Sequence, residues 1–172
     1  VARVMPVNGA WLELWPTPAA LAAAPVGDAI RAWGRLGYPR RAMRLHAAAS
    51  AITEQHHGTV PDSYAELVAL PGVGDYTASA VLAFAFGRSR AVLDTNVRRV
   101  LARLDGFALP ASTSVTVAER ARAVSLLPDD EKLAARFSVA LMELGALVCR
   151  ARAPHCVQCP IGSICAWHGA GA

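Results

Sequence analysis

The 172-residue chain has little of what marks disordered, membrane or secreted proteins. Charged residues make up 17% of it, which is too few for a disordered chain. Aromatic residues make up only 6%, which disfavours a β-sandwich or barrel. No run approaches the roughly 18–20 uninterrupted apolar residues that a membrane helix needs, and the first residues lack the apolar core of a signal peptide. These absences leave one large or two small folded domains.

Lysine is almost absent. Lys132 is the only one, and the other cations are arginines, which give a formal net charge of +4. A basic balance suits a polyanionic partner, although a base composition that favours arginine codons accounts for much of the bias. The scarcity of lysine bears on the chemistry considered below.

Cysteine is absent before position 149, after which four cysteines follow within 17 residues, as Cys149, Cys156, Cys159 and Cys165. Disulfides usually join distant segments, whereas thiols crowded into one loop indicate a metal site in a reducing compartment. Four thiolates at such spacing can bind a 4Fe–4S cluster or a tetrahedral zinc ion. A single Cys-x2-Cys pair with one cysteine on either side favours the iron–sulfur cluster over zinc, and the compartment indicates a cytoplasmic location.

Helix signals run along the whole chain, and no sustained alternation of apolar and polar residues indicates strands, so the predicted fold class is all-α. Capping residues, glycines and prolines predict helices over Ala19–Ala24, Ala29–Leu36, Arg40–His57, Tyr76–Phe86, Asn96–Leu104, Thr113–Leu127 and Asp129–Val148. A further short helix is predicted to begin at Asp62 or Ser63 and to run through Leu70, and Asp94 or Thr95 is predicted to start the helix over Asn96–Leu104. Thr17 and Asp28 are expected to cap the helices over Ala19–Ala24 and Ala29–Leu36, and Asp75 is expected to cap the helix over Tyr76–Phe86. The break at Gly87–Arg90 predicts two domains, residues 1–88 and 89–172.

The turn Leu70-Pro71-Gly72-Val73-Gly74 joins two predicted helices. Its glycines permit a tight reversal and the close approach of a partner, and the free amides of the next helix can bind a phosphate. An ordinary tight turn is the alternative. With the flanking Leu-Pro and Thr77-Ala78, the turn resembles the helix-hairpin-helix pattern of DNA-binding proteins, which favours phosphate binding. The predicted DNA contacts are Leu70, Gly72, Val73, Gly74 and Thr77.

Asp94 and Asn96 stand at the start of a later helix. An aspartate in that place is most often an N-cap. Asp94, however, lies 20 residues beyond Gly74, after one apolar helix and a turn, and that arrangement can return a carboxylate to the DNA-facing side of the hairpin. A carboxylate there could stabilise positive charge on a deoxyribose.

Taken together, these residues resemble the helix-hairpin-helix DNA glycosylases that carry an iron–sulfur cluster, a superfamily that includes endonuclease III and the MutY-type adenine glycosylases. The resemblance covers nearly the whole chain and is carried by Trp33–Leu45, Leu70–Ala78, Val92–Arg103, Met142–Cys149 and the cysteine spacing. It implies a six-helix-barrel domain over residues 1–88 with the hairpin at 62–87. It also implies an iron–sulfur domain over residues 89–172 with the cluster loop at 149–165.

Position 76 separates the chemistries of this superfamily. Endonuclease III-like enzymes place a nucleophilic lysine there, whereas this chain has Tyr76, so strand cutting through that residue is excluded. A tyrosine at this position is similar to what the MutY-type enzymes and some thymine–guanine mismatch glycosylases have there. Both kinds of enzyme excise the base without cutting the strand. The resemblance therefore implies a monofunctional glycosylase that removes adenine opposite 8-oxoguanine or guanine.

The resemblance also assigns roles to single residues. An adenine is flipped into a pocket between the two helical halves, and Asp94 stabilises the oxocarbenium-like sugar as the protonated base leaves. Asn96 positions Asp94 or the attacking water, and Tyr76 lines the site. Tyr38 matches a tyrosine that wedges into the base stack, although a buried aromatic at a helix end is the alternative.

Further basic and aromatic residues have simpler interpretations. Arg150 and Arg152 lie in the first loop between cysteines, as does His155, and could meet phosphates or form a solvated loop. A solvated basic face, with a possible share in phosphate contact, is expected for Arg98, Arg99 and Arg103. Core positions are expected for Trp11, Trp15 and Trp33.

In the family, the glutamate that protonates adenine lies before the position where this chain begins, and a domain that helps to recognise 8-oxoguanine follows the cluster. We therefore expect the central part of a longer bacterial enzyme, monomeric and bound to nucleoid DNA that contains a mismatch or an oxidised guanine. Thymine excision from T·G pairs and mismatch binding without turnover remain alternatives. A purely structural or electron-transfer iron–sulfur protein is disfavoured, because it would leave the hairpin and Asp94 without a purpose.

Overall fold

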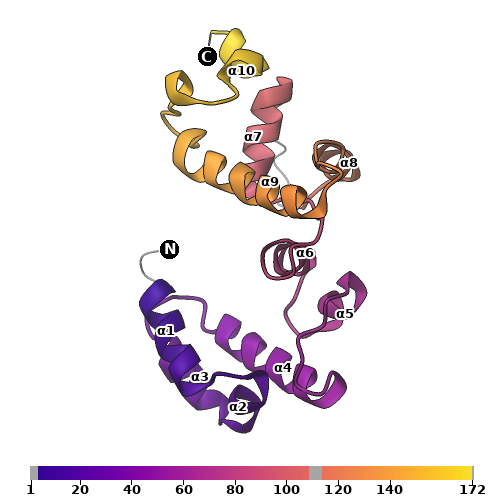
Figure 1. The fold of residues 1–172 in the computed structure, drawn as a ribbon. Helices are drawn as coiled ribbons and strands as arrows, with labels where there is room; N and C mark the ends of the chain where they lie inside the picture. Colours follow the sequence, from indigo (N-terminus) through magenta and orange to yellow (C-terminus); the bar gives the residue numbers. More distant parts are fainter. Residues whose placement is uncertain (1–3, 109–113, 172) are drawn as a thin grey trace. The chain divides into compact units, whose positions relative to one another are not determined.

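The computed structural model describes residues 4–108 and 114–171, and the regular elements in these ranges are all helical (Figure 1). The all-α prediction is confirmed. Within the same ranges, each helix is too short or too polar to cross a membrane. The α-helices are α1 (Val4–Leu14), α2 (Pro18–Ala23), α3 (Val26–Trp33), α4 (Arg40–Gln55), α5 (Tyr64–Ala69), α6 (Asp75–Phe84), α7 (Thr95–Asp105), α8 (Val117–Ser125), α9 (Glu131–Glu143) and α10 (Ala166–Gly169). A π-helical turn (Leu144–Val148) continues α9, and two 3-10 turns (Cys156–Gln158 and Gly162–Ile164) lie in the cysteine loop.

The chain divides into two compact units, residues 1–78 and 79–172. The division falls inside α6, whereas the sequence indicated Gly87–Arg90. The glycine at this break shows where a helix ends, whereas the division into units follows from which residues contact one another. Residues of α6 are buried on both sides of the division, as Ala78 and Leu82 show. The assignment of the two halves as barrel and cluster domains stays a prediction.

In the first unit, α2 and α3 pack on α4, and α1 packs on α3 (Figure 1). Alanines at the contacts, such as Ala29 and Ala42, let the helices approach closely around Trp11. Trp15 and Trp33 pack against this cluster, and both meet Trp11 edge to face, at 5.0 and 5.6 Å between ring centroids. The three tryptophans are therefore core residues, as expected.

Several helix boundaries differ from the sequence predictions. Thr17 caps α2 as predicted, but α3 begins at Val26 after Pro25, so Asp28 lies in its first turn and pairs with Arg31. Asp75 is the first residue of α6 rather than its cap. The helix expected over Thr113–Leu127 begins only after Thr116, which forms a capping box with Glu119. Thr113 itself lies outside the described residues.

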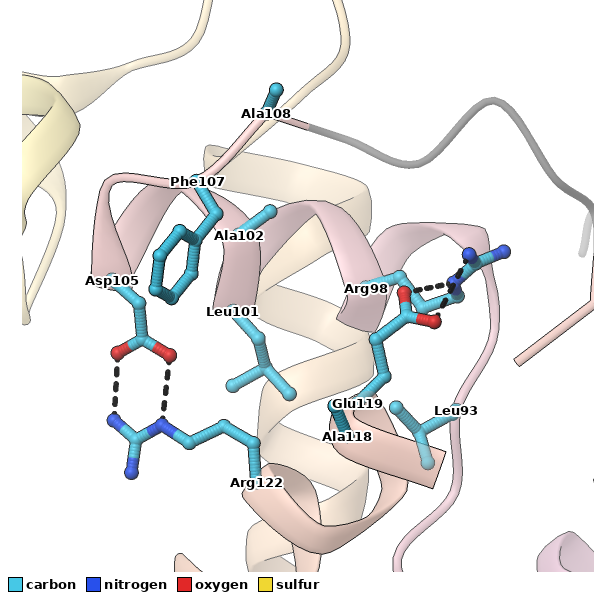
Figure 2. A pocket seen from close by; sticks show the side chains of 10 residues that line it. All are labelled: Leu93, Arg98, Leu101, Ala102, Asp105, Phe107, Ala108, Ala118, Glu119 and Arg122. Atoms are coloured by element: carbon cyan, nitrogen blue, oxygen red, sulfur yellow. Dashed lines mark hydrogen bonds and ion pairs between the residues drawn. The ribbon is translucent and has the colours of Figure 1, made fainter. Parts of the chain in front are cut away.

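Two ion pairs tie α7 to α8 in the second unit, beside an apolar pocket that both helices line (Figure 2). Arg98 Nε donates to Glu119 Oε1 at 2.6 Å, and Arg122 Nη2 donates to Asp105 Oδ1 at 2.7 Å. The hydrogen bond from Arg98, reinforced by those from Thr116, holds the pKa of the Glu119 carboxyl below its usual value. The hydrogen bond from Arg122 does the same for the pKa of Asp105.

We expect Glu119→Gln to lower the free energy of unfolding by about 2 kcal/mol, because Arg98 is only 7% exposed and its hydrogen bonds to Glu119 would pass from a charged acceptor to a neutral amide. A carboxyl whose pKa is lowered by folding stabilises the fold above its unfolded pKa, and this contribution is lost as the pH falls through the folded value. Urea unfolding from about pH 7 to about pH 3 should therefore show a shallower loss of stability in the variant than in the wild type.

The matched control is Glu131→Gln, because Glu131 meets Arg88 at 3.7 Å with both side chains about half exposed. That change should alter the free energy of unfolding by less than about 1 kcal/mol. Equal losses in the two variants would contradict the importance assigned to the buried pair.

Candidate functional site

Asp94 stands at the N-terminus of α7 and is held by two hydrogen bonds. Its Oδ1 accepts the backbone N–H of Val97 at 2.7 Å, and its Oδ2 accepts from Nδ2 of Asn96 at 2.7 Å. The predicted N-cap is thus confirmed, and the carboxylate is only partly buried. One carboxyl group therefore caps a helix while part of its surface stays open to a reactant.

Asn96 is oriented in turn by Arg99, one turn further along α7. Arg99 Nη2 donates to Oδ1 of Asn96 at 2.8 Å, which fixes the amide so that its nitrogen faces Asp94. The guanidinium also donates to the carbonyl oxygens of Gly145 at 2.7 Å and Cys149 at 2.8 Å. A continuous chain of hydrogen bonds therefore joins Asp94 to the backbone of the first cysteine.

Gly145 lies in the π-helical turn that follows α9 and packs closely against α7. A Cβ atom at this position would stand 2.8 Å from the Cβ of Asn96 and 2.9 Å from its carbonyl oxygen. Only a residue without a side chain fits here without a shift of the Asn96 backbone. The sequence carried this signal in the segment Met142–Cys149, but spacing alone could not say what Gly145 touches.

The solvated basic face expected for three arginines of α7 is wrong. Arg98 and Arg99 are buried, at 7% and 6% exposure, and Arg103 is half-buried. Each guanidinium instead reaches a partner distant in sequence: Glu119 for Arg98, Gly145 and Cys149 for Arg99, and Arg150 and Ala151 for Arg103. Composition could not reveal this, because the partners lie 21 to 50 residues away.

The four cysteines are brought together. All are free, all are half-buried, and all line one apolar cavity with Trp167 and His168. Among the described residues, no three His, Cys, Asp or Glu side chains are close enough to hold one metal ion between them. The four predicted donors therefore line one shared space.

The predicted phosphate contacts of the cysteine loop differ in exposure. Arg152 is exposed, whereas Arg150 is half-buried and directs Nη2 to the carbonyl oxygen of Ala153 at 3.0 Å and to Nε2 of His155 at 2.5 Å. Arg150 therefore braces its own loop, and Arg152 is the more accessible of the two cations.

The hairpin turn lies in the first unit between α5 and α6. Leu70 is buried at 5% exposure, so its side chain belongs to the core and only its backbone could meet a ligand. Gly72, Gly74 and Thr77 are exposed, and Val73 is half-buried. These four residues therefore leave the turn accessible to a partner.

Gly72 has a left-handed backbone (φ +75°), and a Cβ there would stand 2.5 Å from Cβ of Arg44. The stem of Arg44 therefore packs on the turn from α4, a contact that the sequence analysis missed. No local signal could have found it, because Arg44 lies on a different helix and 28 residues before Gly72.

Tyr38 is 81% exposed and has a left-handed backbone conformation (φ 47°), which is rare for a bulky residue. The exposure rules out the alternative of a buried aromatic at a helix end. Trp33 holds the loop in place by donating from Nε1 to the carbonyl oxygen of Gly37 at 2.8 Å. Strained backbone of this kind gathers at ligand-contacting sites, which is compatible with the wedge that remains a prediction.

Tyr76 lies in the first turn of α6 and is 43% exposed. It belongs to the first unit, whereas Asp94 and Asn96 belong to the second. Its predicted place in the lining of the reaction site therefore stays a prediction.

Comparison with known proteins gives matches along the whole chain. The helix-hairpin-helix motif family matches residues 55–84, which contain the turn described above. An adenine DNA glycosylase of Mycobacterium tuberculosis is 51% identical over 99% of this chain and 55% of that protein. A thymine-DNA glycosylase of Aeropyrum pernix is 33% identical over 96% of this chain and 75% of that protein.

Among solved structures, a non-covalent endonuclease III–DNA complex superposes with a TM-score of 0.84. Its sequence is 26% identical, and the match covers 99% of this chain and 78% of that one. The chain thus spans about half the length of the mycobacterial relative but most of the endonuclease III chain.

We expect Gly145→Ala to lower the free energy of unfolding by about 1–3 kcal/mol, because the new methyl group overlaps the backbone of Asn96. Denaturant unfolding measures this loss, and the side-chain amide signals of Asn96 in NMR should shift with it. The control is Gly9→Ala in α1, where a Cβ meets nothing within 4 Å and helix propensity predicts an unchanged or raised stability. A variant at Gly145 as stable as the control would contradict the close approach.

Proposed function

Because the chain belongs to the MutY-type helix-hairpin-helix DNA glycosylases, we propose that it acts in base excision repair. The proposed reaction is hydrolysis of the N-glycosidic bond of adenine mispaired with 8-oxoguanine or guanine, without strand cutting. The higher identity to an adenine glycosylase than to a thymine-DNA glycosylase favours adenine over thymine as the base.

The observation that carries this proposal is the geometry of Asp94. Its two hydrogen bonds, from Val97 N–H and Asn96 Nδ2, fix the plane of the carboxylate while leaving it partly exposed. A preorganised negative charge stabilises a developing cation more than a mobile one does, because no reorganisation is needed during the reaction. The arrangement suits the oxocarbenium-like sugar that forms as a base departs.

In the proposed reaction, the target deoxyadenosine leaves the base stack, its base takes up a proton and the bond from sugar C1′ to the base breaks, after which water adds to C1′ and releases a proton. Asp94 stabilises the positive charge that develops on the sugar. Asn96 acts as a positioning residue, because Arg99 fixes the amide that donates to Asp94. Tyr76 lines the reaction site, and Tyr38 enters the base stack beside the target.

We further propose that the four cysteines bind a 4Fe–4S cluster. Their thiols are free and share one apolar cavity, which fits a soft, thiolate-bound cofactor. In such a cluster each cysteine binds a different iron atom, and four thiols that line one shared cavity suit that arrangement. When bound, the cluster would cross-link the loop between Cys149 and Cys165.

The proposed partner is duplex DNA that contains the mismatch, bound by a monomer in the bacterial cytoplasm. The exposed turn Gly72–Gly74, Thr77 and Arg152 would contact phosphates, which fix the register of the protein on the duplex without reading its sequence. Affinity for any duplex should therefore fall steeply with salt.

Asp94→Asn should lower the single-turnover rate of adenine excision by about 10²–10³-fold while leaving duplex affinity nearly unchanged. Asparagine is a good N-cap and keeps an oxygen for Val97 N–H, so α7 should still form. The assay uses duplexes with A·8-oxoguanine, A·G and T·G pairs, and it is run on this chain and on the chain extended at both ends by its gene sequence.

Asp129→Asn is the matched control, because Asp129 is exposed and lies in the same unit. Excision that survives Asp94→Asn would refute the assigned role, and a joint loss of excision and binding would reduce Asp94 to a structural cap. If neither wild-type chain excises a base although both bind duplex, the mismatch-binding alternative holds. Preferred excision from the T·G duplex would favour the thymine alternative.

Gly74→Leu should weaken binding to matched and mismatched duplexes alike by about ten-fold, since it would block one or more charge-assisted bonds to phosphate. A Cβ at Gly74 meets nothing within 4 Å, so the substitution should not disturb the fold itself. Gly9→Leu places the same side chain in open space on α1 and should leave affinity unchanged. Fluorescence anisotropy over a salt series measures the duplex affinity of both variants. A loss of affinity confined to one mismatch would contradict phosphate binding.

A further inference from the structure

Arg103 reaches from the last turns of α7 into the cysteine cavity. Its Nη1 lies 3.3 Å from Sγ of Cys149 and donates to the carbonyl oxygen of Arg150 at 2.8 Å. Its Nη2 donates to the carbonyl oxygen of Ala151 at 3.3 Å. One guanidinium thus contacts both a cysteine sulfur and the backbone that follows it.

The indole ring of Trp167 covers this guanidinium. The Cζ atom of Arg103 lies 4.5 Å from the ring centroid, which is a cation–π contact. Both side chains line the cavity and both are half-buried. Trp167 thereby displaces water from one side of the cation, and the lower local dielectric strengthens the field of Arg103 at the nearby sulfur.

Arg99, the neighbour of Arg103 on α7, donates to three carbonyl-type oxygens in the described part of the chain, those of Asn96, Gly145 and Cys149. Arg103 is therefore the arginine of α7 that touches a cysteine sulfur in the described structure. A hydrogen bond and a positive charge at a coordinating sulfur draw electron density from a metal cluster and stabilise its more reduced state.

We propose that Arg103, covered by Trp167, sets the reduction potential of the cofactor held by the four cysteines and protects it from oxidation. This inference rests on the proposed 4Fe–4S cofactor. Arg103 is a positioning and tuning residue that acts through Cys149, and it makes no contact with substrate. The contacts to Arg150 and Ala151 hold the guanidinium in place while Nη1 faces the sulfur.

Three variants separate the parts of this contact. Arg103→Met removes the charge and the donors and keeps most of the stem. Arg103→Lys keeps the charge but lacks the planar fork that can reach a sulfur and two carbonyls together. Trp167→Leu leaves the arginine in place and exposes it to water. The control is Arg136→Met, because Arg136 is exposed on α9 in the same unit and its loss changes the net charge equally.

The first measurement is the iron and sulfide content of the wild-type chain, purified with its cofactor. A wild-type chain without iron would overturn the proposed cofactor, and this inference with it. Redox titration of the bound cluster then follows the transfer of one electron from the cluster to a one-electron mediator. Loss of the visible sulfur-to-iron absorption in air reports on protection.

Arg103→Met should raise the equilibrium constant for this oxidation about ten-fold, and the cluster should bleach several-fold faster than in wild type. For Arg103→Lys and Trp167→Leu, the equilibrium constant and the bleaching rate should lie between those of wild type and Arg103→Met. Both quantities should be unchanged in Arg136→Met. If Arg103→Met loses its cluster during purification, the other two variants decide the matter. A potential unchanged in both, with iron bound, would overturn the tuning role while the proposed cofactor stands.

Discussion

A guanidinium that is only 6% exposed must satisfy its N–H groups inside the protein, since the desolvation of a charge costs several kcal/mol. In the described part of the chain, the partners of Arg99 are three oxygens that carry no formal charge, on Asn96, Gly145 and Cys149. Two of these are the carbonyls of Gly145 and Cys149, in the π-helical turn that continues α9 and at its C-cap, where helical carbonyls lack intrahelical donors and a cation is favoured. The burial of Arg99 therefore fixes how α7 meets this π-helical turn.

The contacts of Arg99 affect both ends of the series of hydrogen bonds that runs from Asp94 to Cys149. At one end, Arg99 donates to the side-chain oxygen of Asn96 and so orients the amide nitrogen toward Asp94. At the other, the carbonyl of Cys149 is tied to α7 before the cysteine loop begins. Gly145 permits the arrangement, because any side chain there would push Asn96 away. The candidate carboxylate and the cysteine cavity thus share one rigid support within the second unit.

In the first unit, buried or packed residues hold two exposed segments in place, the Tyr38 loop and the Gly72 turn. Trp33 is packed in the aromatic core and still donates to Gly37, so the core itself holds the loop that presents Tyr38. The stem of Arg44 fills the space that a side chain at Gly72 would need. An exposed tyrosine and an exposed turn are both supported from beneath by buried or packed neighbours. Such support suits a surface that must keep its shape while a stiff, charged partner binds.

Local chemistry determined much of this protein from sequence alone. Thr17 caps its helix as predicted, and Ser63 and Asp94 are each one of the two caps that the pattern left open, because capping needs only a side-chain oxygen and the next few amides. The cysteine spacing identified the four thiols, and Tyr76 excluded a lysine nucleophile, because both are matters of residue type. Tertiary structure alone decided that Arg98, Arg99 and Arg103 turn inward, that Leu70 is core and that Tyr38 is exposed. The partners of the three arginines lie 21 to 50 residues away, and no local pattern records which distant carbonyl or carboxylate a cation will meet.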